Sequence, residues 1–292
     1  MKFCIDRLFE AVRDKGHVCL GLDTYASYVP PLERKKAAND AEAVLAFNRA
    51  LIDATIDVAA CFKVQIAYYE EMGIDGLKTY SQTLKYIREK NGIAIADIKR
   101  GDIADTARRY ANAHFSGDFE ADFVTLNPYM GMDTLDPWLE IAKARGKSAF
   151  VLMRTSNPGM RDFEYQELSS GGRLYNTVGE KLSTLATQTS GENGYGIFGA
   201  VIGCTERDEA AEIRQKHPSL FFLIPGYGAQ GGGASDAALL LKNGNGGVVN
   251  ASRSLITAWQ KEENSPNAGN AFAGLAARKA AEKMRDEIRA VL

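Results

Sequence analysis

Eight short apolar segments, spaced along nearly the whole chain, constrain its fold more than any other feature. They are rich in β-branched residues, and most precede a stretch with helical periodicity, such as residues 40–59, 133–146 and 235–244. The eight segments are residues 18–23, 61–67, 93–99, 123–127, 148–153, 197–203, 220–225 and 247–252. Eight strands that alternate with helices predict a closed parallel (β/α)₈ barrel, an α/β fold, as a single domain over residues 1–292.

A doubly wound open sheet is the alternative fold. Its glycine fingerprint should follow the first strand, but residues 21–30 read GLDTYASYVP, which lacks the G-x-G-x-x-G pattern. The barrel is therefore favoured, with an N-terminal helix and long loops after strands 1, 5 and 8. The loop at 154–172 is polar and Gly-rich, which suits a lid over a pocket, and the polar tract at 257–271 links the last strand to the final helix.

The composition excludes several classes of protein. A net charge of −2, without a basic stripe, argues against nucleic-acid binding. No apolar stretch approaches the length of a membrane span, and the N-terminal residues lack the apolar core of a secretory signal, so we expect a soluble, cytoplasmic protein. The four cysteines form no CxxC and are expected to be buried thiols, and the three histidines show no zinc-ligand spacing. A metal held by carboxylates alone stays open.

Charged residues begin where the apparently buried third strand ends, in the stretch ADIKRGDIADTA at 96–107. In a barrel the carboxyl ends of all strands meet at one mouth, and residues two apart on a strand share a face, so Asp97 and Lys99 should point the same way. Asp102 follows at the start of the next helix, where it would also suit a capping role. Lys63 lies inside the second strand, where an unpaired ammonium would be costly, and Asp23 ends the first strand.

These positions predict an alternating network of Lys63, Asp97, Lys99 and Asp102 with no net charge. The network is interpreted as catalytic, and a structural salt-bridge cluster is the alternative. A lysine flanked by carboxylates keeps its proton, which makes it an acid and a poor Schiff-base nucleophile. Such a site suits the protonation of a carbanion or enolate.

A phosphate site is predicted at the last two strand ends. The seventh strand is followed by PGYGAQGGGASDAA at 225–238, whose glycines let backbone N–H groups approach an anion, and Arg253 follows the eighth strand. A flexible connector and a surface arginine are the alternatives. Barrel enzymes often bind phosphate at this pair of loops, which favours the site.

Taken together, these segments resemble the orotidine 5′-phosphate decarboxylase family in its longer bacterial form, the type 2 subfamily. The resemblance rests on residues 21–23, 62–65, 97–107, 154–159, 225–232 and 250–254, and therefore covers most of the barrel. It implies decarboxylation of orotidine 5′-phosphate to uridine 5′-phosphate (UMP), the last step of de novo UMP synthesis, without a metal or other cofactor.

The resemblance also implies roles for individual residues. Asp23 and Lys63 would contact the ribose hydroxyls, and Lys63 would also belong to the charge network. Asp97 would lie against the substrate carboxylate, and Lys99 would protonate C6 as carbon dioxide leaves. Ser156 would hydrogen-bond the pyrimidine.

Two further groups of residues follow from the same resemblance. Gln230, Gly231 and Arg253 would hold the phosphate. Asp102, Ile103 and Thr106 would reach into the active site of the neighbouring subunit of a homodimer. The stretch TLNPYMG after the fourth strand fits the long form of the family, but it gives Asn127 no role.

Two other functions stay open. A metal-dependent sugar-phosphate decarboxylase or aldolase of the same superfamily would resemble this chain at D-x-K-x-x-D, but would place a metal-binding carboxylate where Lys63 stands. A phosphoribosyl-ligand sensor without turnover would have no need of the complete charge network.

Overall fold

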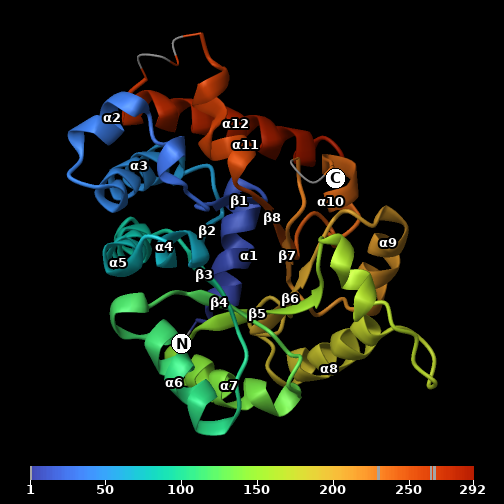
Figure 1. Ribbon diagram of the computed structural model, residues 1–292. Coiled ribbons are helices and arrows are strands. Elements are labelled where there is room, and N and C mark those ends of the chain that lie inside the picture. The colour runs from blue at the N-terminus through green and yellow to red at the C-terminus, as the bar shows by residue number, and fades with distance from the viewer. Residues whose placement is uncertain (1, 229–230, 264, 266–267) are drawn as a thin grey trace.

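The strands close into one parallel barrel, in which each strand pairs with its neighbours in chain order and β8 pairs with β1 (Figure 1). The computed structural model describes residues 2–228, 231–263, 265 and 268–292. The strands are β1 Val18–Gly21, β2 Cys61–Gln65, β3 Ala94–Arg100, β4 Phe123–Leu126, β5 Ser148–Arg154, β6 Phe198–Ile202, β7 Phe222–Ile224 and β8 Gly247–Ala251. The predicted (β/α)₈ barrel is confirmed.

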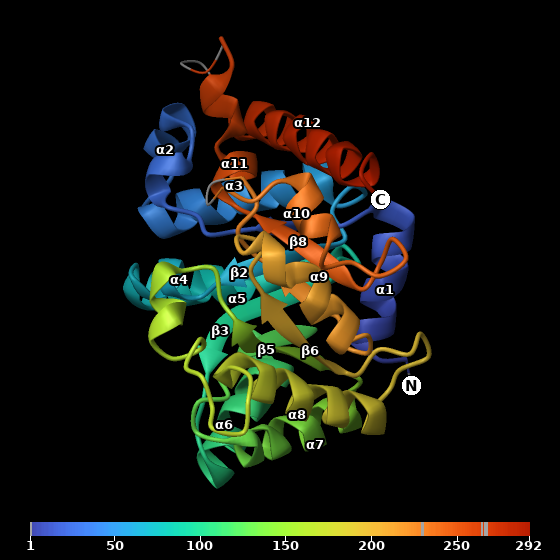
Figure 2. The same ribbon diagram turned by 90° about the vertical axis from the view of Figure 1, so that its right-hand side faces the viewer.

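Helices surround the ring of strands, so most strand residues are buried on both faces (Figure 1). The helices are α1 Cys4–Lys15, α2 Pro31–Lys36, α3 Asp40–Thr55, α4 Ala67–Glu70, α5 Gly73–Glu89, α6 Ala104–Phe115, α7 Asp136–Arg145, α8 Leu174–Gln188, α9 Arg207–Lys216, α10 Ala234–Ala238, α11 Arg253–Ile256 and α12 Asn270–Arg289. The last of these, α12, packs along α3 and α11 on the outside of the barrel (Figure 2).

The helix predicted over 235–244 is shorter than its periodicity suggested, because α10 ends at Ala238. The chain must turn back at once to enter β8 at Gly247, and it does so through Asn243 and Gly244, which have φ angles of 51° and 73°. After the helix ends, the amides of Leu240 and Leu241 donate to the carbonyls of Ala237 and Ala238 at 3.0 Å in tighter turns, and the left-handed residues then reverse the chain before β8.

The long loop after β5 contains only a short 3₁₀ segment, Pro158–Asp162, before α8 begins. Two carboxylates hold it. Glu164 accepts hydrogen bonds from the N–H and hydroxyl of Thr155, at 2.9 and 2.8 Å. Glu209 of α9 pairs with Arg173 and accepts a bond from the Tyr165 hydroxyl at 2.6 Å. These contacts attach the loop to the end of β5 and to α9.

The N-terminal helix α1 closes the amino end of the barrel and lies behind the ring of strands in Figure 1. Its first amide, that of Cys4, donates to the carbonyl of Gly146 just before β5, at 2.8 Å. Arg7 of α1 pairs with Asp122, the residue before β4, at 3.1 Å. The other Asp122 oxygen accepts the backbone N–H of Ala94 at 2.9 Å, so one buried carboxylate joins α1 to β3 and β4.

Removal of this carboxylate should lower the stability of the fold. Asp122→Ala leaves the Ala94 N–H and the Arg7 guanidinium without their partner, and the free energy of unfolding should fall by about 2–4 kcal/mol. Urea denaturation followed by circular dichroism measures this. Asp14→Ala, which removes an exposed carboxylate of the same helix, is the control and should cost less than about 0.5 kcal/mol. Equal small losses for both variants would contradict the assigned role of Asp122.

Candidate active site

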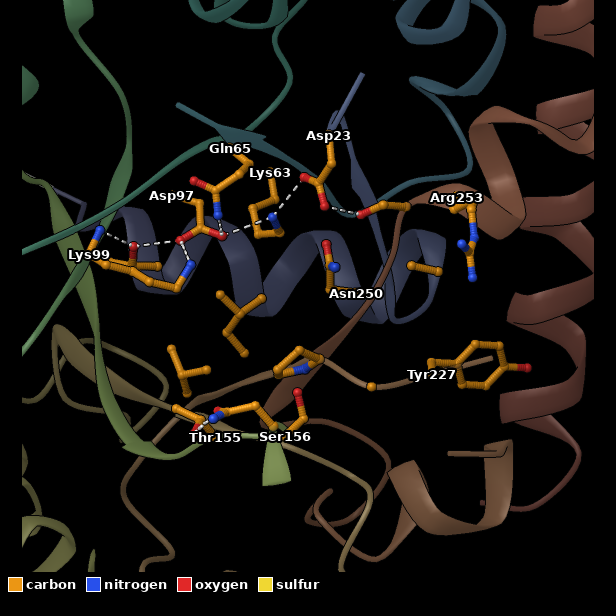
Figure 3. Close-up of a pocket in the computed structure, with 18 of the residues that line it drawn as sticks. Asp23, Lys63, Gln65, Asp97, Lys99, Thr155, Ser156, Tyr227, Asn250 and Arg253 are labelled. Atoms are coloured by element: carbon orange, nitrogen blue, oxygen red, sulfur yellow. Dashed lines mark hydrogen bonds and ion pairs between the residues drawn. The ribbon is translucent and has the colours of Figure 1, made fainter. Parts of the chain in front are cut away.

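A cavity of about 660 Å³ opens at the carboxyl ends of the strands, at the opposite end of the barrel from α1. All eight strands or the loops that follow them contribute to its wall, as expected for the working end of such a barrel. Figure 3 shows charged side chains along one side of the cavity, with Thr155 and Ser156 across from them and Arg253 and Tyr227 at one end.

Four charged groups form a continuous chain along this wall (Figure 3). The Lys99 ammonium donates to Asp97 Oδ1 at 2.6 Å, and Lys63 donates to Asp97 Oδ2 at 2.9 Å. Lys63 also donates to Asp23 Oδ1 at 3.0 Å. Lys63 and Asp97 are buried, whereas the Lys99 side chain is 46% exposed to the cavity and solvent. Lys99 is therefore the positively charged group of this network that can contact a ligand.

The two buried members of the chain stay ionised at neutral pH. Burial by itself would lower the pKa of Lys63, but the carboxylates of Asp23 and Asp97 outweigh it and raise that pKa above its ordinary value. Burial would likewise raise the pKa of Asp97, but Lys63 and Lys99 outweigh it and hold the pKa well below its usual range. Asp97 is thus a carboxylate with no proton to donate.

Three neutral side chains complete the network, and their roles were not predicted from the sequence. Gln65 donates to Asp97 Oδ2 at 2.9 Å, and the Thr125 hydroxyl donates to Asp97 Oδ1 at 2.8 Å. Ser252 donates to Asp23 Oδ2 at 2.7 Å. Alternation along β2 could have placed Gln65 beside Lys63, but contacts between different strands depend on register, which the sequence does not show.

Asp102 does not join the network of its own chain, contrary to the arrangement predicted from spacing. Its Oδ1 accepts the backbone N–H of Ile103 at 2.8 Å, and the ion pairs of the described residues include none between Asp102 and either network lysine. The chain leaves the mouth at Gly101, where a Cβ would lie 2.9 Å from the Asn127 carbonyl oxygen. The fourth charged group of the network is instead Asp23, which pairs with Lys63.

Ile103 and Thr106 share this position on the rim. Both are exposed, and neither lines the cavity of its own chain. Ile103 is 52% exposed, and two large hydrophobic residues after β4, Tyr129 and Met130, are 79% and 52% exposed.

The structure describes two of the three residues predicted to hold a phosphate. Arg253, at the start of α11, is exposed and lines the cavity together with Gly226 and Tyr227. Gly231 has a φ of 93° and is not among the residues that line the cavity. Gln230 lies outside the described residues.

Other expectations concern metals, thiols and membranes. Among the described residues, no three His, Cys, Asp or Glu side chains are grouped closely enough to hold a metal ion. The four cysteines are free and buried, as predicted. In the part of the chain that the structure describes, no helix is both long enough and apolar enough to cross a membrane.

The lowered pKa of Asp97 predicts how acid weakens the fold. Its contribution to stability is present above the unfolded-state pKa of about 3.9 and is lost as the pH falls through the still lower folded-state pKa. The raised pKa of Lys63 keeps that group charged throughout this range. The difference in unfolding free energy between wild type and Asp97→Asn should therefore stay constant from about pH 8 to 5 and shrink below about pH 4. Urea denaturation at each pH measures it, and a decline already between pH 8 and 6 would contradict the charge state assigned to Asp97.

Comparisons with known proteins agree with this geometry. The model of the "Orotidine 5'-phosphate decarboxylase / HUMPS family" matches residues 16–265. Orotidine 5′-phosphate decarboxylase of Clostridium perfringens is 55% identical over 284 residues, which are 97% of this chain and 97% of that protein. The protein of the same name from Clostridium acetobutylicum is 54% identical over 288 residues, 99% of each chain.

Solved structures give the same result. The OMP decarboxylase of Leishmania donovani superimposes with a TM-score of 0.76 at 29% identity, over 100% of this chain and 98% of that chain. The UMP synthase of Leishmania donovani superimposes with a TM-score of 0.79 at 30% identity, over 100% of this chain and 57% of that chain. The chain belongs to the orotidine 5′-phosphate decarboxylase family.

Proposed function

We infer that this chain is a carboxy-lyase that converts orotidine 5′-phosphate to UMP, and we propose that the charge network performs the reaction with Lys99 as the proton donor. The observation that carries this proposal is the chain of Lys99, Asp97, Lys63 and Asp23 along one wall of a cavity that ends at Arg253. Relatives that are 54–55% identical over nearly the whole chain carry the name of this activity and support the inference.

The substrate would lie along the cavity with its phosphate at Arg253 and its reacting carbon at Lys99. A guanidinium offers a planar pair of donors to a phosphate, and the loops after β7 and β8 are where barrels often hold one. Gln230 and Gly231 would add donors from the β7 loop. Between the two ends, Asp23 and Lys63 would meet the ribose hydroxyls, and Ser156 would bond to the pyrimidine from the opposite wall.

The chemical step breaks one carbon–carbon bond and forms one carbon–hydrogen bond. The C6–carboxylate bond breaks, carbon dioxide leaves, and the electron pair stays on C6. The Lys99 ammonium gives its proton to C6 and becomes a neutral amine, which takes a proton back from water. The fixed charges cost no reorganisation as the negative charge moves to C6, which is how a preorganised site stabilises a transition state.

Asp97 has a defined part in this step. Its carboxylate is ionised and held by four donors, so it would lie against the substrate carboxylate as a like charge. Departure of carbon dioxide removes that repulsion, while the ion pair with Lys99 keeps the proton donor in place. Repulsion of the substrate carboxylate and positioning of Lys99 are the two contributions of Asp97, and kinetics can separate them.

Each cavity would be completed by a second copy of this chain. Asp102, Ile103 and Thr106 lie on the rim outside their own cavity, and Ile103 presents an exposed apolar side chain there. We propose a two-fold homodimer in which these residues reach the partner's site and Asp102 supplies the further carboxylate.

Lys63 distinguishes this function from that of the metal-dependent relatives. Its buried ammonium, paired with Asp23 and Asp97, would repel a divalent cation at the place where those relatives have a metal-binding carboxylate. A non-catalytic sensor remains the other alternative.

One assay tests the proposed function. The protein is incubated with orotidine 5′-phosphate and excess EDTA, and the loss of pyrimidine absorbance is followed. We expect turnover at the same rate with and without EDTA. Absence of turnover would refute decarboxylation, and substrate binding without turnover would favour a sensor. Turnover that EDTA abolishes would favour the metal-dependent relatives.

The shared site predicts recovery of activity when two inactive variants are mixed. Lys99→Ala and Asp102→Ala chains should each be inactive alone. In a mixed dimer, one site carries both defects and the other takes an intact Lys99 from one chain and an intact Asp102 from its partner. Random exchange makes half of the dimers mixed, so activity should return to about a quarter of wild type.

The control pairs Lys99→Ala with Asp97→Asn, two defects that act within the same chain's site, and mixing these should restore nothing. If the Lys99→Ala and Asp102→Ala mixture also stays inactive while mass spectrometry confirms exchange, Asp102 does not act across the interface.

A further inference from the structure

We propose that Thr125 is a positioning residue for the decarboxylation, because its single hydroxyl holds both the Asp97 carboxylate and the backbone that carries Lys99. The proposal rests on the proposed function of the site. Thr125 lies on β4 at the floor of the cavity, and the residue is 1% exposed.

All the hydrogen bonds that the Thr125 hydroxyl can make are made to residues of β3. It donates to Asp97 Oδ1 at 2.8 Å. It accepts the backbone N–H of Ile98 at 3.0 Å and that of Lys99 at 2.9 Å. A hydroxyl has one proton to donate and two lone pairs that accept, so these three bonds satisfy it completely. No other side chain in the network touches both the carboxylate and the backbone of β3 among the described residues.

The two amides need this partner because β3 departs from regular pairing at the same point. Ala96 lies opposite Val124, and the next aligned pair is Arg100 with Leu126, so β3 advances four residues while β4 advances two. The extra residues form a bulge whose N–H groups lose their ladder partners, and the Thr125 oxygen replaces them. Within the bulge Lys99 has a φ of 45°, in the left-handed region that a residue with a Cβ rarely adopts. The hydroxyl therefore stabilises an unfavourable backbone conformation.

This conformation sets where the proton donor lies. The Lys99 ammonium reaches Asp97 Oδ1, the same oxygen that receives the Thr125 hydroxyl, at 2.6 Å. Loss of the hydroxyl would free the carboxylate to turn and would leave two backbone amides without an acceptor. Both changes move Lys99 relative to the carbon it must protonate, and neither touches the phosphate end of the cavity. The expected defect is therefore in kcat and not in binding.

Thr125→Val tests the proposal, because it keeps the shape and β-branching of threonine and removes the hydroxyl. We expect kcat for orotidine 5′-phosphate to fall about a hundredfold, the effect of misplacing a reacting group by about 1 Å. KM and the affinity for UMP should change less than about threefold, since no proposed ligand contact is lost. Thr125→Ser, which keeps the hydroxyl, should retain kcat within about fivefold of wild type.

A control separates this effect from general loss of a buried hydroxyl. Thr55 in α3 is fully buried and donates to the Leu51 carbonyl, away from the cavity, so Thr55→Val should leave kcat near the wild-type value. Wild-type kcat in Thr125→Val would overturn the proposal. So would a serine variant as slow as the valine variant, because the shape of the side chain and not its hydroxyl would then matter.

Two further measurements keep the test decisive. If Thr125→Val does not fold, Thr125→Ala is compared with Thr125→Ser, and the alanine variant should be about a hundredfold slower. Failure of both hydroxyl-free variants to fold would make Thr125 a purely structural residue and overturn the proposal. A crystal structure of a folded hydroxyl-free variant should show Lys99 Nζ more than about 3.5 Å from Asp97 Oδ1. An unchanged contact would refute the positioning role even if the wild type proved to have no decarboxylase activity.

Discussion

The two salt bridges of Lys63 are the interaction on which the rest of the site depends. An ammonium buried between β1 and β3 is tolerable only while Asp23 and Asp97 neutralise it, because a buried charge without a partner is strongly destabilising. The pairing fixes the ends of three neighbouring strands relative to one another. It also orients the Asp97 carboxylate, whose two oxygens accept from Lys63, Lys99, Gln65 and Thr125. A carboxylate held by four donors cannot turn toward an incoming ligand, so the site keeps its charges in place before the substrate arrives.

The barrel separates the residues that hold the fold from those that face the ligand. At the amino end, Asp122 joins α1 to the starts of two strands and takes no part in the cavity. At the carboxyl end, side chains that would be expensive to bury lie at the tips of strands, where a continuous barrel supports them. The loop after β5 brings Ser156 to the cavity, and Glu164 and Glu209 anchor it. In the proposed binding mode, binding energy from the phosphate at the far end would be used at the reacting carbon.

The barrel could be predicted from the sequence because strands buried on both faces read as continuous apolar segments, and each of the eight segments overlaps one strand. The sequence also located Asp23, Lys63, Asp97 and Lys99, since charged residues at the ends of buried strands have few structural uses. Prediction of the site from the sequence was wrong or incomplete where a contact depends on strand register or on the course of a turn. Spacing placed Asp102 in the network of its own chain, but the turn at Gly101 carries it to the rim. The roles of Thr125 and Ser252 depend on hydrogen bonds between different strands. The positive φ of Lys99 arises from a bulge in β3 that no residue pattern predicts.

In the proposed reaction the Lys99 ammonium protonates the substrate carbon while other groups bind the nucleotide. These two roles can be separated in the Lys99→Ala variant by two measurements on the same preparation: single-turnover decarboxylation of orotidine 5′-phosphate, and the affinity for UMP by calorimetry. Loss of a general acid typically costs a factor of 10²–10⁴, and here a fixed charge is lost as well, so turnover should fall by at least about a thousandfold. The affinity for UMP should stay within about tenfold of wild type, because the phosphate and ribose contacts remain. Near-normal turnover, or loss of UMP binding in step with turnover, would show that Lys99 is not the proton donor.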